Sequence, residues 1–397
     1  MGSTSNIDRV LSEAVETGEV PGVVALAASD RGILYQGAFG RRDIAGGPAM
    51  TIDTVFRIAS MTKAVTSVAA MQLVEQGALS LDEPIGGVLP ELAEPYVLKG
   101  FDAAGKPRLR PAKRPITLRH LLTHTAGFGY EMLSGDLIRY VAATKTPSTS
   151  TGQLASLRLP LLLDPGDKWE YGINLDWVGR AIEAASGQTL DRYFRDHIFA
   201  PLGMADSGFE LSPSQQARLV RVHQRRADRS LEPITVDMPP RDPEFWAGGG
   251  ALYSTGPDYL AFLRMLLGGG KLDGGKPGGT GLLRPETVAE MGKNQVGDLA
   301  AGIMRTAMPE RTNDFVLFPE GTCRWGLGYM INTEPGANGR SAGSLSWGGV
   351  FNSYYWIDPA NRVAAVIMTQ ILPFADPQTL ALCGAFERAV YASLGNA

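Results

Sequence analysis

The most regular pattern of hydrophobic positions in this chain lies between residues 60 and 75. Its apolar residues recur at intervals of three and four, the spacing of one helix face. They are Met61, Ala64, Val65, Val68, Met71 and Val74. Gly77 follows as a helix-terminating residue. The pattern predicts an amphipathic helix that Ser60 opens, with Lys63 one turn later on the same face.

The front of the chain predicts a helix followed by a hairpin. One apolar helix face runs from Ile7 to Val15 and ends before Gly18. Two apolar runs follow, 23–28 and 33–40, separated by turn residues. A hairpin of this kind needs further strands, because two strands alone are marginally stable.

The last third of the chain mirrors the front. A helix is predicted over 260–267, strands over 353–357 and 362–370, and a final helix after Asp376, which has the features of an N-cap. A helix and hairpin at the front, with a hairpin and helix at the back, predict one sheet assembled from both ends.

The middle of the chain has helical runs and few alternating ones. Helices are predicted around 116–122, 179–185 and 190–199, punctuated by proline and glycine. We therefore expect a mainly helical domain over 84–241.

The expected fold class is α/β (α+β), with an antiparallel sheet flanked by helices. Residues 1–83 and 242–397 would form a discontinuous α/β domain around the helical insertion, and we expect the active site in the cleft between them.

Composition narrows the classes of function. The 397 residues are 44% hydrophobic and 20% charged, with a net charge of −4, which is ordinary for a globular protein and favours neither nucleic acid nor an anionic membrane as partner.

The basic residues between Lys99 and Arg114 are interpreted as a solvated loop. Cys323 and Cys383 fit a reducing compartment, with one disulfide still possible. Since no signal peptide is evident, we expect a cytoplasmic location. The oligomeric state stays open.

The pattern Ser60-x-x-Lys63 is the leading candidate for chemistry. A serine hydroxyl becomes a useful nucleophile only when a neighbouring base takes its proton, and a lysine amine can be that base. A rival pattern, Gly-x-Ser-x-Gly around Ser341, lies in a loop-like stretch with no helix and no histidine after it, so it does not fit a nucleophile elbow.

Several separated motifs resemble one family. The motifs are Phe56–Lys63, Leu121–Gly127, Glu170–Trp177, Pro201–Met204 and Ser346–Val350. Together they are similar to serine β-lactamases and penicillin-binding proteins, more closely to the class C branch and the family VIII carboxylesterases, and also to acyltransferases of statin biosynthesis.

The resemblance implies the fold and the catalytic roles. It implies a β-lactamase-like fold in which Ser60 is the nucleophile, and Lys63 and Tyr171 transfer its proton. The backbone N–H groups of Ser60 and Val350 would form the oxyanion hole. Which of Lys63 and Tyr171 is the resting base stays open. His124 is expected to be structural, because Lys63 already supplies the base, and Asp176 is expected to satisfy buried polar groups near Tyr171.

Two departures from the family pattern bear on the substrate. Trp347 stands where penicillin-binding relatives have a lysine, and Ile173 where they have an asparagine. Both changes remove polar contacts to a β-lactam and add apolar surface. The residues expected to bind substrate are Phe128, Tyr130, Ile173, Asn174, Trp347, Gly348, Gly349 and Phe351.

The sequence thus predicts a serine hydrolase for short-chain carboxylic esters, with weak β-lactam hydrolysis possible. The alternatives are an acyltransferase that uses the same acyl-enzyme, a β-lactamase or peptidase proper, and a non-catalytic binding protein. The expected partner is a small ester, with no cofactor and no metal.

Overall fold

The computed structural model describes residues 4–236, 240, 242–271, 281–316, 318 and 321–394. Its centre is a seven-stranded sheet in the order β11-β12-β13-β14-β15-β1-β2, in which every neighbouring pair is antiparallel. The strands are β1 (Gly22–Ser29), β2 (Ile33–Gly40), β11 (Cys323–Trp325), β12 (Met330–Asn332), β13 (Leu345–Gly349), β14 (Ser353–Asp358) and β15 (Val363–Met368). Since β1 pairs with β15, the prediction of one sheet from both chain ends is confirmed.

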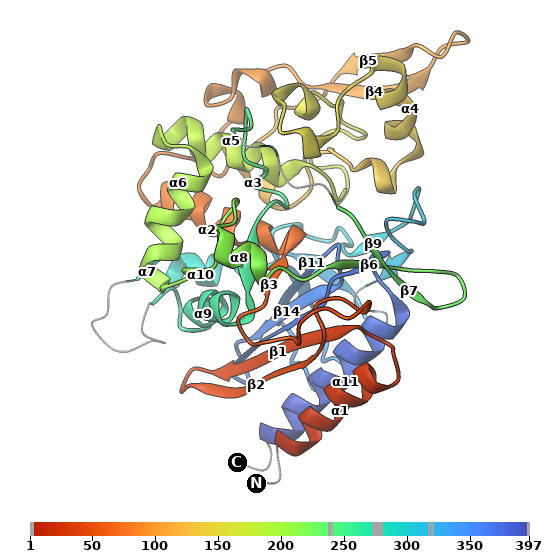
Figure 1. Ribbon diagram of the computed structural model, residues 1–397. Coiled ribbons are helices and arrows are strands. Elements are labelled where there is room, and N and C mark those ends of the chain that lie inside the picture. The colour runs from red at the N-terminus through yellow and green to blue at the C-terminus, as the bar shows by residue number, and fades with distance from the viewer. Residues whose placement is uncertain are drawn as a thin grey trace.

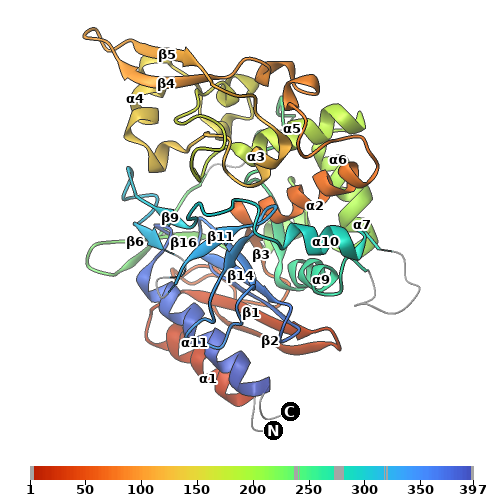
Figure 2. The ribbon, with the colours of Figure 1, turned by 180° about the vertical axis from the view of Figure 1, so that it is seen from behind.

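Helices cover both faces of this sheet. Figures 1 and 2 show α1 (Thr4–Glu16) and α11 (Pro377–Leu394) side by side on one face, while α9 (Gly256–Leu267) packs against the other. Successive residues of β14 reach opposite helices, as the alternation of a strand requires. Tyr355 meets Tyr259 of α9, and Trp356 meets Phe386 of α11. Because helices cover both faces of the sheet, every residue of β14 and β15 is buried.

The predicted serine helix exists but is not amphipathic. A short 3-10 turn, Ala59–Met61, precedes α2 (Thr62–Glu75), so Ser60 lies just before the α-helix rather than in its first turn. Residues 62–73 are all buried, including several polar ones. The helix packs against α5 (Asn174–Ser186). Its polar positions face protein rather than water, as Thr66 does in donating to the carbonyl of Gly248.

The middle of the chain is largely helical, as predicted, but it also contains a hairpin. Its remaining helices are α3 (Leu118–Leu122), α4 (Gly135–Thr144), α6 (Leu190–Phe194), α7 (Ala200–Leu202) and α8 (Pro213–Ala217). The interpretation of 99–114 as a solvated loop is wrong in part, because β4 (Tyr96–Phe101) pairs with β5 (Pro107–Pro111). Arg110 on this hairpin is held by two hydrogen bonds to the buried Asp164, so one of its basic residues is structural.

Smaller pairings connect the middle segment to the rest. A hairpin of β6 (Val222–Arg225) and β7 (Leu231–Ile234) pairs in parallel with β16 (Ile371–Leu372), so this part of the expected helical segment joins the sheet side. The two-domain division at residue 241 stays a prediction. The other elements are β3 (Val55–Arg57), β8 (Tyr253–Thr255), β9 (Ile303–Met304), β10 (Phe315–Val316) and α10 (Pro285–Met291).

Two further features bear on the sequence expectations. Cys323 and Cys383 are both free thiols. Within the described part of the chain, no helix combines the length and the apolarity needed to cross a membrane.

Candidate active site

Ser60 lies at a sharp bend between β3 and α2. The preceding residue, Ala59, has φ of +45°, a left-handed conformation that costs a non-glycine residue roughly 1 kcal/mol. The bend packs against the end of β13, where a Cβ on Gly349 would lie 2.4 Å from the carbonyl oxygen of Ile58. Only glycine therefore fits at this position, and the close approach brings the serine turn against the strand.

The amine of Lys63 is fully buried and has three acceptors within reach. Nζ lies 3.1 Å from Ser60 Oγ, 3.1 Å from the hydroxyl oxygen of Tyr130 and 2.6 Å from the carbonyl oxygen of Gly249. A protonated amine has one N–H donor for each of these oxygens, and a neutral amine has a lone pair that can take the serine proton. The geometry thus joins the serine hydroxyl, the amine and one tyrosine hydroxyl in a single hydrogen-bonded group.

Tyr171 meets Lys63 with its ring rather than with its hydroxyl. Nζ of Lys63 lies 4.8 Å from the Tyr171 ring centroid, a cation–π arrangement. The Tyr171 hydroxyl accepts a hydrogen bond of 3.0 Å from the indole N–H of Trp347. Burial, with Asp176 and Tyr171 nearby, raises the pKa of Tyr130 well above its usual value, so its hydroxyl is a neutral phenol.

A buried carboxylate stands behind the lysine. Asp176 accepts the N–H of Gly249 at 2.9 Å, and the carbonyl of the same glycine accepts from Lys63. A Cβ on Gly249 would lie 2.6 Å from the Asp176 carboxylate, so a side chain would break this chain of contacts. Burial raises the pKa of Asp176, while the Lys63 charge opposes that rise. As expected, Asp176 satisfies a buried polar group, although that group belongs to Gly249.

His124 is buried and structural in its contacts. Its Nδ1 lies 2.9 Å from the side-chain amide of Asn174, and its ring meets Trp325 edge-on. Burial and the Lys63 charge lower the pKa of His124 well below its usual value, so the ring is neutral. These contacts hold the segment that carries Tyr130 against the start of α5.

A small pocket opens onto the serine. Its lining has no charged residue among those that the structure describes, and consists of Ser60, Met132, Leu133, Tyr171, Met304, Thr312, Trp347, Gly348, Val350 and Phe374. About 10 Å³ of it is open to water, which is room for about one water molecule. A substrate must therefore displace parts of this lining to enter.

No group of three histidine, cysteine, aspartate or glutamate side chains suited to a metal ion occurs in the described ranges.

Comparison with known proteins fits this geometry. The family model described as "Beta-lactamase" matches residues 7–382. This chain belongs to the beta-lactamase family. A monacolin J acid methylbutanoyltransferase from Aspergillus terreus is 35% identical to it, with 97% of this chain and 95% of that protein covered. A lovastatin esterase from Penicillium rubens is 32% identical, with 92% of this chain and 93% of that protein covered.

Solved structures give the same result for the fold. Unliganded simvastatin synthase (LovD) from Aspergillus terreus superimposes with a TM-score of 0.84 at 33% identity, over 99% of this chain and 98% of that one. The predicted beta-lactamase-like fold and the resemblance to the statin-pathway acyltransferases are therefore confirmed.

Some of the predicted substrate-binding residues of this beta-lactamase-family chain lie at the pocket. Trp347 and Gly348 line it together with Ser60 and with Val350, which was predicted for the oxyanion hole. Tyr130 is not in this lining, but its hydroxyl contacts the Lys63 amine. Ser60 and Val350 line the same pocket, which is compatible with the expected oxyanion hole. The oxyanion hole itself stays a prediction.

The other predicted substrate-binding residues lie in the core. Phe128 stacks on Trp177, Ile173 is buried before α5, and the amide of Asn174 bonds to His124. Phe351 packs in an apolar cluster with Ala59, Val222 and Leu372, and Gly349 packs against Ile58. The described geometry gives no support to a contact of these five residues with substrate, because their surfaces are already covered by protein.

Sequence analysis missed the acceptor of Lys63 and most of the pocket wall. Gly249 acts through a backbone carbonyl, so its residue type gives no signal. Met132, Met304 and Phe374 come from three distant segments whose apolar residues look like ordinary core. The rival Ser341 accepts a hydrogen bond from Asn361 in a loop before β13, remote from this site.

Proposed function

We propose that this protein hydrolyses short-chain carboxylic esters through an acyl-enzyme on Ser60. One observation carries the proposal: the Lys63 amine lies 3.1 Å from the Ser60 hydroxyl at the edge of a pocket whose described lining has no charge. The amine is suited to accept the serine proton, and the lining is suited to an uncharged, apolar acyl group.

In the proposed reaction Lys63 acts as a neutral amine. Ser60 Oγ attacks the carbonyl carbon of the ester, and the lone pair of Lys63 Nζ takes the serine proton. The N–H groups of Ser60 and Val350 stabilise the negative oxygen of the tetrahedral intermediate. The alcohol leaves with the proton that the serine gave up. Water then attacks the acyl-enzyme in the same way and releases the acid.

Tyr171 has a different part in this scheme. Its ring faces the Lys63 amine and its hydroxyl is held by the Trp347 indole. A rotation that exchanges the indole for Lys63 would let Tyr171 shuttle the proton, as the family resemblance implies. In the arrangement described here, Tyr130 is the tyrosine whose hydroxyl touches the amine.

An acyltransferase is the second candidate, and the names of the relatives favour it. A relative at 35% identity is called a methylbutanoyltransferase, while one at 32% is called an esterase. Both activities use the same first half-reaction and differ in whether water or another alcohol takes the acyl group. The first relative's name gives methylbutanoyl as its acyl group and monacolin J acid as the acceptor. We therefore propose esters of small branched acids as the substrate class of this chain.

The test follows the acyl group by mass spectrometry. Brief exposure to p-nitrophenyl butyrate should add one butyryl group to Ser60, and Ser60→Ala should show no adduct. Adding an alcohol such as monacolin J acid then separates the two candidates. Release of butyrate supports the hydrolase, and a butyryl ester of the added alcohol supports the transferase. An adduct that persists on Ser60→Ala, or none on the wild type, would contradict both.

A further inference from the structure

A second cavity lies beside β3 and away from the serine pocket. It has a volume of about 310 Å³, the lower end of the range for small-molecule sites. Its lining comes from β3, the loop after β2, the segment before β6, and β7 with the residues after it. Neither the proposed reaction nor the comparisons assign it a role.

The described lining of this cavity carries more positive than negative charge. It includes Arg42, Arg57 and Arg221, and one carboxylate among the described residues, Asp43. Nearby, His223 accepts the N–H of Ile44 through Nε2, and burial lowers the pKa of His223, so the ring adds no charge.

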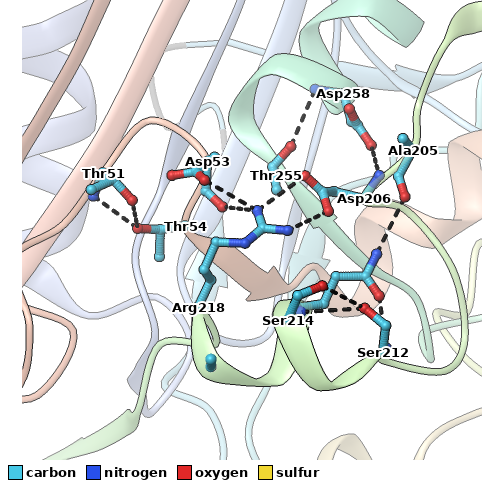
Figure 3. Close-up of polar contacts among 12 residues, drawn as sticks. Thr51, Asp53, Thr54, Ala205, Asp206, Ser212, Ser214, Arg218, Thr255 and Asp258 are labelled. Carbon is cyan, nitrogen blue, oxygen red and sulfur yellow. Dashed lines mark hydrogen bonds and ion pairs between the residues drawn. The ribbon is translucent and has the colours of Figure 1, made fainter.

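Two arginines of the cavity, Arg42 and Arg221, differ from Arg218. Figure 3 shows Arg218 directed at Asp206 and Asp53, which neutralise it. Across the described ranges, no ion pair involves Arg42 or Arg221. Arg42 donates to the carbonyl of Ala217 and the hydroxyl of Thr51, both neutral acceptors.

The positions of these guanidinium groups are partly fixed. The Nε of Arg42 is buried with no hydrogen-bond partner among the described residues. Arg57 lies 5.6 Å over the ring of Tyr253, and the Gln370 side chain bonds to its backbone N–H and carbonyl groups. Guanidinium groups held in this way match the planar geometry of a carboxylate.

Much of the remaining lining is aliphatic. It is formed by Leu219, Val220, Val222, Ile234 and Val236. Val222 and Ile234 face each other across the β6–β7 hairpin, and Val222 also packs in the cluster that contains Ala59 and Phe351. The aliphatic wall is therefore the back of the turn that carries Ser60.

We propose that this cavity binds an aliphatic carboxylate. Its oxygens would meet Arg42, Arg57 and Arg221, and its chain would lie on the aliphatic wall. Arginine alone would suit any anion, but arginines and aliphatic side chains lining one cavity favour an acid with a short hydrocarbon chain. Such an acid has two sources: a free acid, of the kind that ester hydrolysis releases, or an acid group on a longer molecule that also reaches Ser60.

The test measures the binding of hexanoate by calorimetry, with 1-hexanol as the uncharged probe of equal chain length. Hexanoate should bind the wild type more tightly than hexanol. Arg221→Ala should weaken hexanoate binding roughly tenfold, the scale of one charged hydrogen bond, and leave hexanol unchanged. Arg221 is exposed, and no side-chain hydrogen bond or ion pair of it is found among the described residues, so this variant should fold.

Arg226→Ala is the matched control. Arg226 follows β6 on the same hairpin, is exposed, and pairs with Glu232 outside the cavity, so hexanoate binding should not change. Equal hexanoate affinity in wild type and Arg221→Ala, or equal affinity of the wild type for hexanoate and hexanol, would overturn the proposal.

A second measurement identifies the source of the acid. Hexanoate binding is repeated after a small methylphosphonate has blocked Ser60. Binding that survives supports a free acid in a separate site, and binding that is lost supports an acid group connected to the serine pocket. The comparison of unblocked wild type with Arg221→Ala does not depend on the nucleophile, so failure of the proposed esterase function would be seen separately.

Discussion

The two walls of the serine pocket satisfy their polar groups in different ways. On the α2 side, Lys63 contacts three oxygens, and Gly249 links it to the buried carboxylate of Asp176. On the β13 side, Trp347 donates its one polar hydrogen to Tyr171 and otherwise presents apolar surface. The first wall is thus arranged for proton transfer before any substrate arrives. The second offers a substrate little besides apolar area and backbone groups.

The largest expected effect removes the nucleophile from the α2 side. Ser60→Ala should lower kcat/KM for p-nitrophenyl butyrate by roughly 10³-fold or more, because no acyl-enzyme can form. Ser341→Ala removes an equivalent hydroxyl from the rival pattern and should keep full activity. Loss of activity in Ser341→Ala with retention in Ser60→Ala would invalidate the site.

The two tyrosines test which hydroxyl works with Lys63. Tyr130→Phe and Tyr171→Phe should each lower kcat by about 100-fold, the usual scale for a general acid–base group. Tyr130 loses a direct contact with the amine, whereas Tyr171 loses the hydroxyl held by Trp347. If Tyr130→Phe kept full activity while Tyr171→Phe lost it, Tyr171 and not Tyr130 would be the tyrosine that transfers the proton.

The α2 side could largely be predicted from the sequence, because its side chains come from compact motifs. Ser60 and Lys63 are three residues apart, and Tyr171 precedes a helix start with a recognisable pattern. The contact between Lys63 and Tyr130 is different, since it joins residues 67 positions apart and depends on tertiary packing.

The same contrast applies to the fold. The sheet from both chain ends followed from local apolar runs, and it is confirmed. The full burial of α2 could not be predicted, because Thr62, Thr66 and Ser67 look like a solvated face until distant segments cover them. Likewise, the pairing of β4 with β5 is hidden by a basic composition typical of loops.

The β13 side is tested by the choice of substrate. With no charged residue in the described lining of the pocket, a cephalosporin carboxylate has no cationic partner there. Losing one charged hydrogen bond is worth about 1.5–3 kcal/mol, so kcat/KM for nitrocefin should be at least ~10-fold below that for p-nitrophenyl butyrate. Both substrates are assayed on one preparation. A faster reaction with nitrocefin would mean that the protein is a β-lactamase in activity as well as in family.

The smallest expected effect concerns Glu170, a partly buried carboxyl group next to Tyr171 in the chain. In the described part of the chain no hydrogen bond reaches its carboxylate, in contrast to the partnered Lys63. Burial raises the pKa of Glu170 from 4.5 to about 7. Because the folded-state pKa lies above the unfolded one, this group favours folding most below pH 4.5, and that contribution is lost as the pH rises from about 4.5 through about 7.

Glu170→Gln keeps the size of the side chain and removes its titration. At 1.36 kcal/mol per pKa unit the full effect is about 3 kcal/mol, and partial exposure of the side chain reduces it to about 1–2 kcal/mol. Urea unfolding at pH 8 should therefore find the variant more stable than the wild type by that amount, and at pH 4.5 the two should agree. Glu16→Gln, at an exposed position of α1, is the control. A variant that is no more stable than the wild type at pH 8 would mean that the Glu170 carboxylate has a stabilising partner in the folded protein.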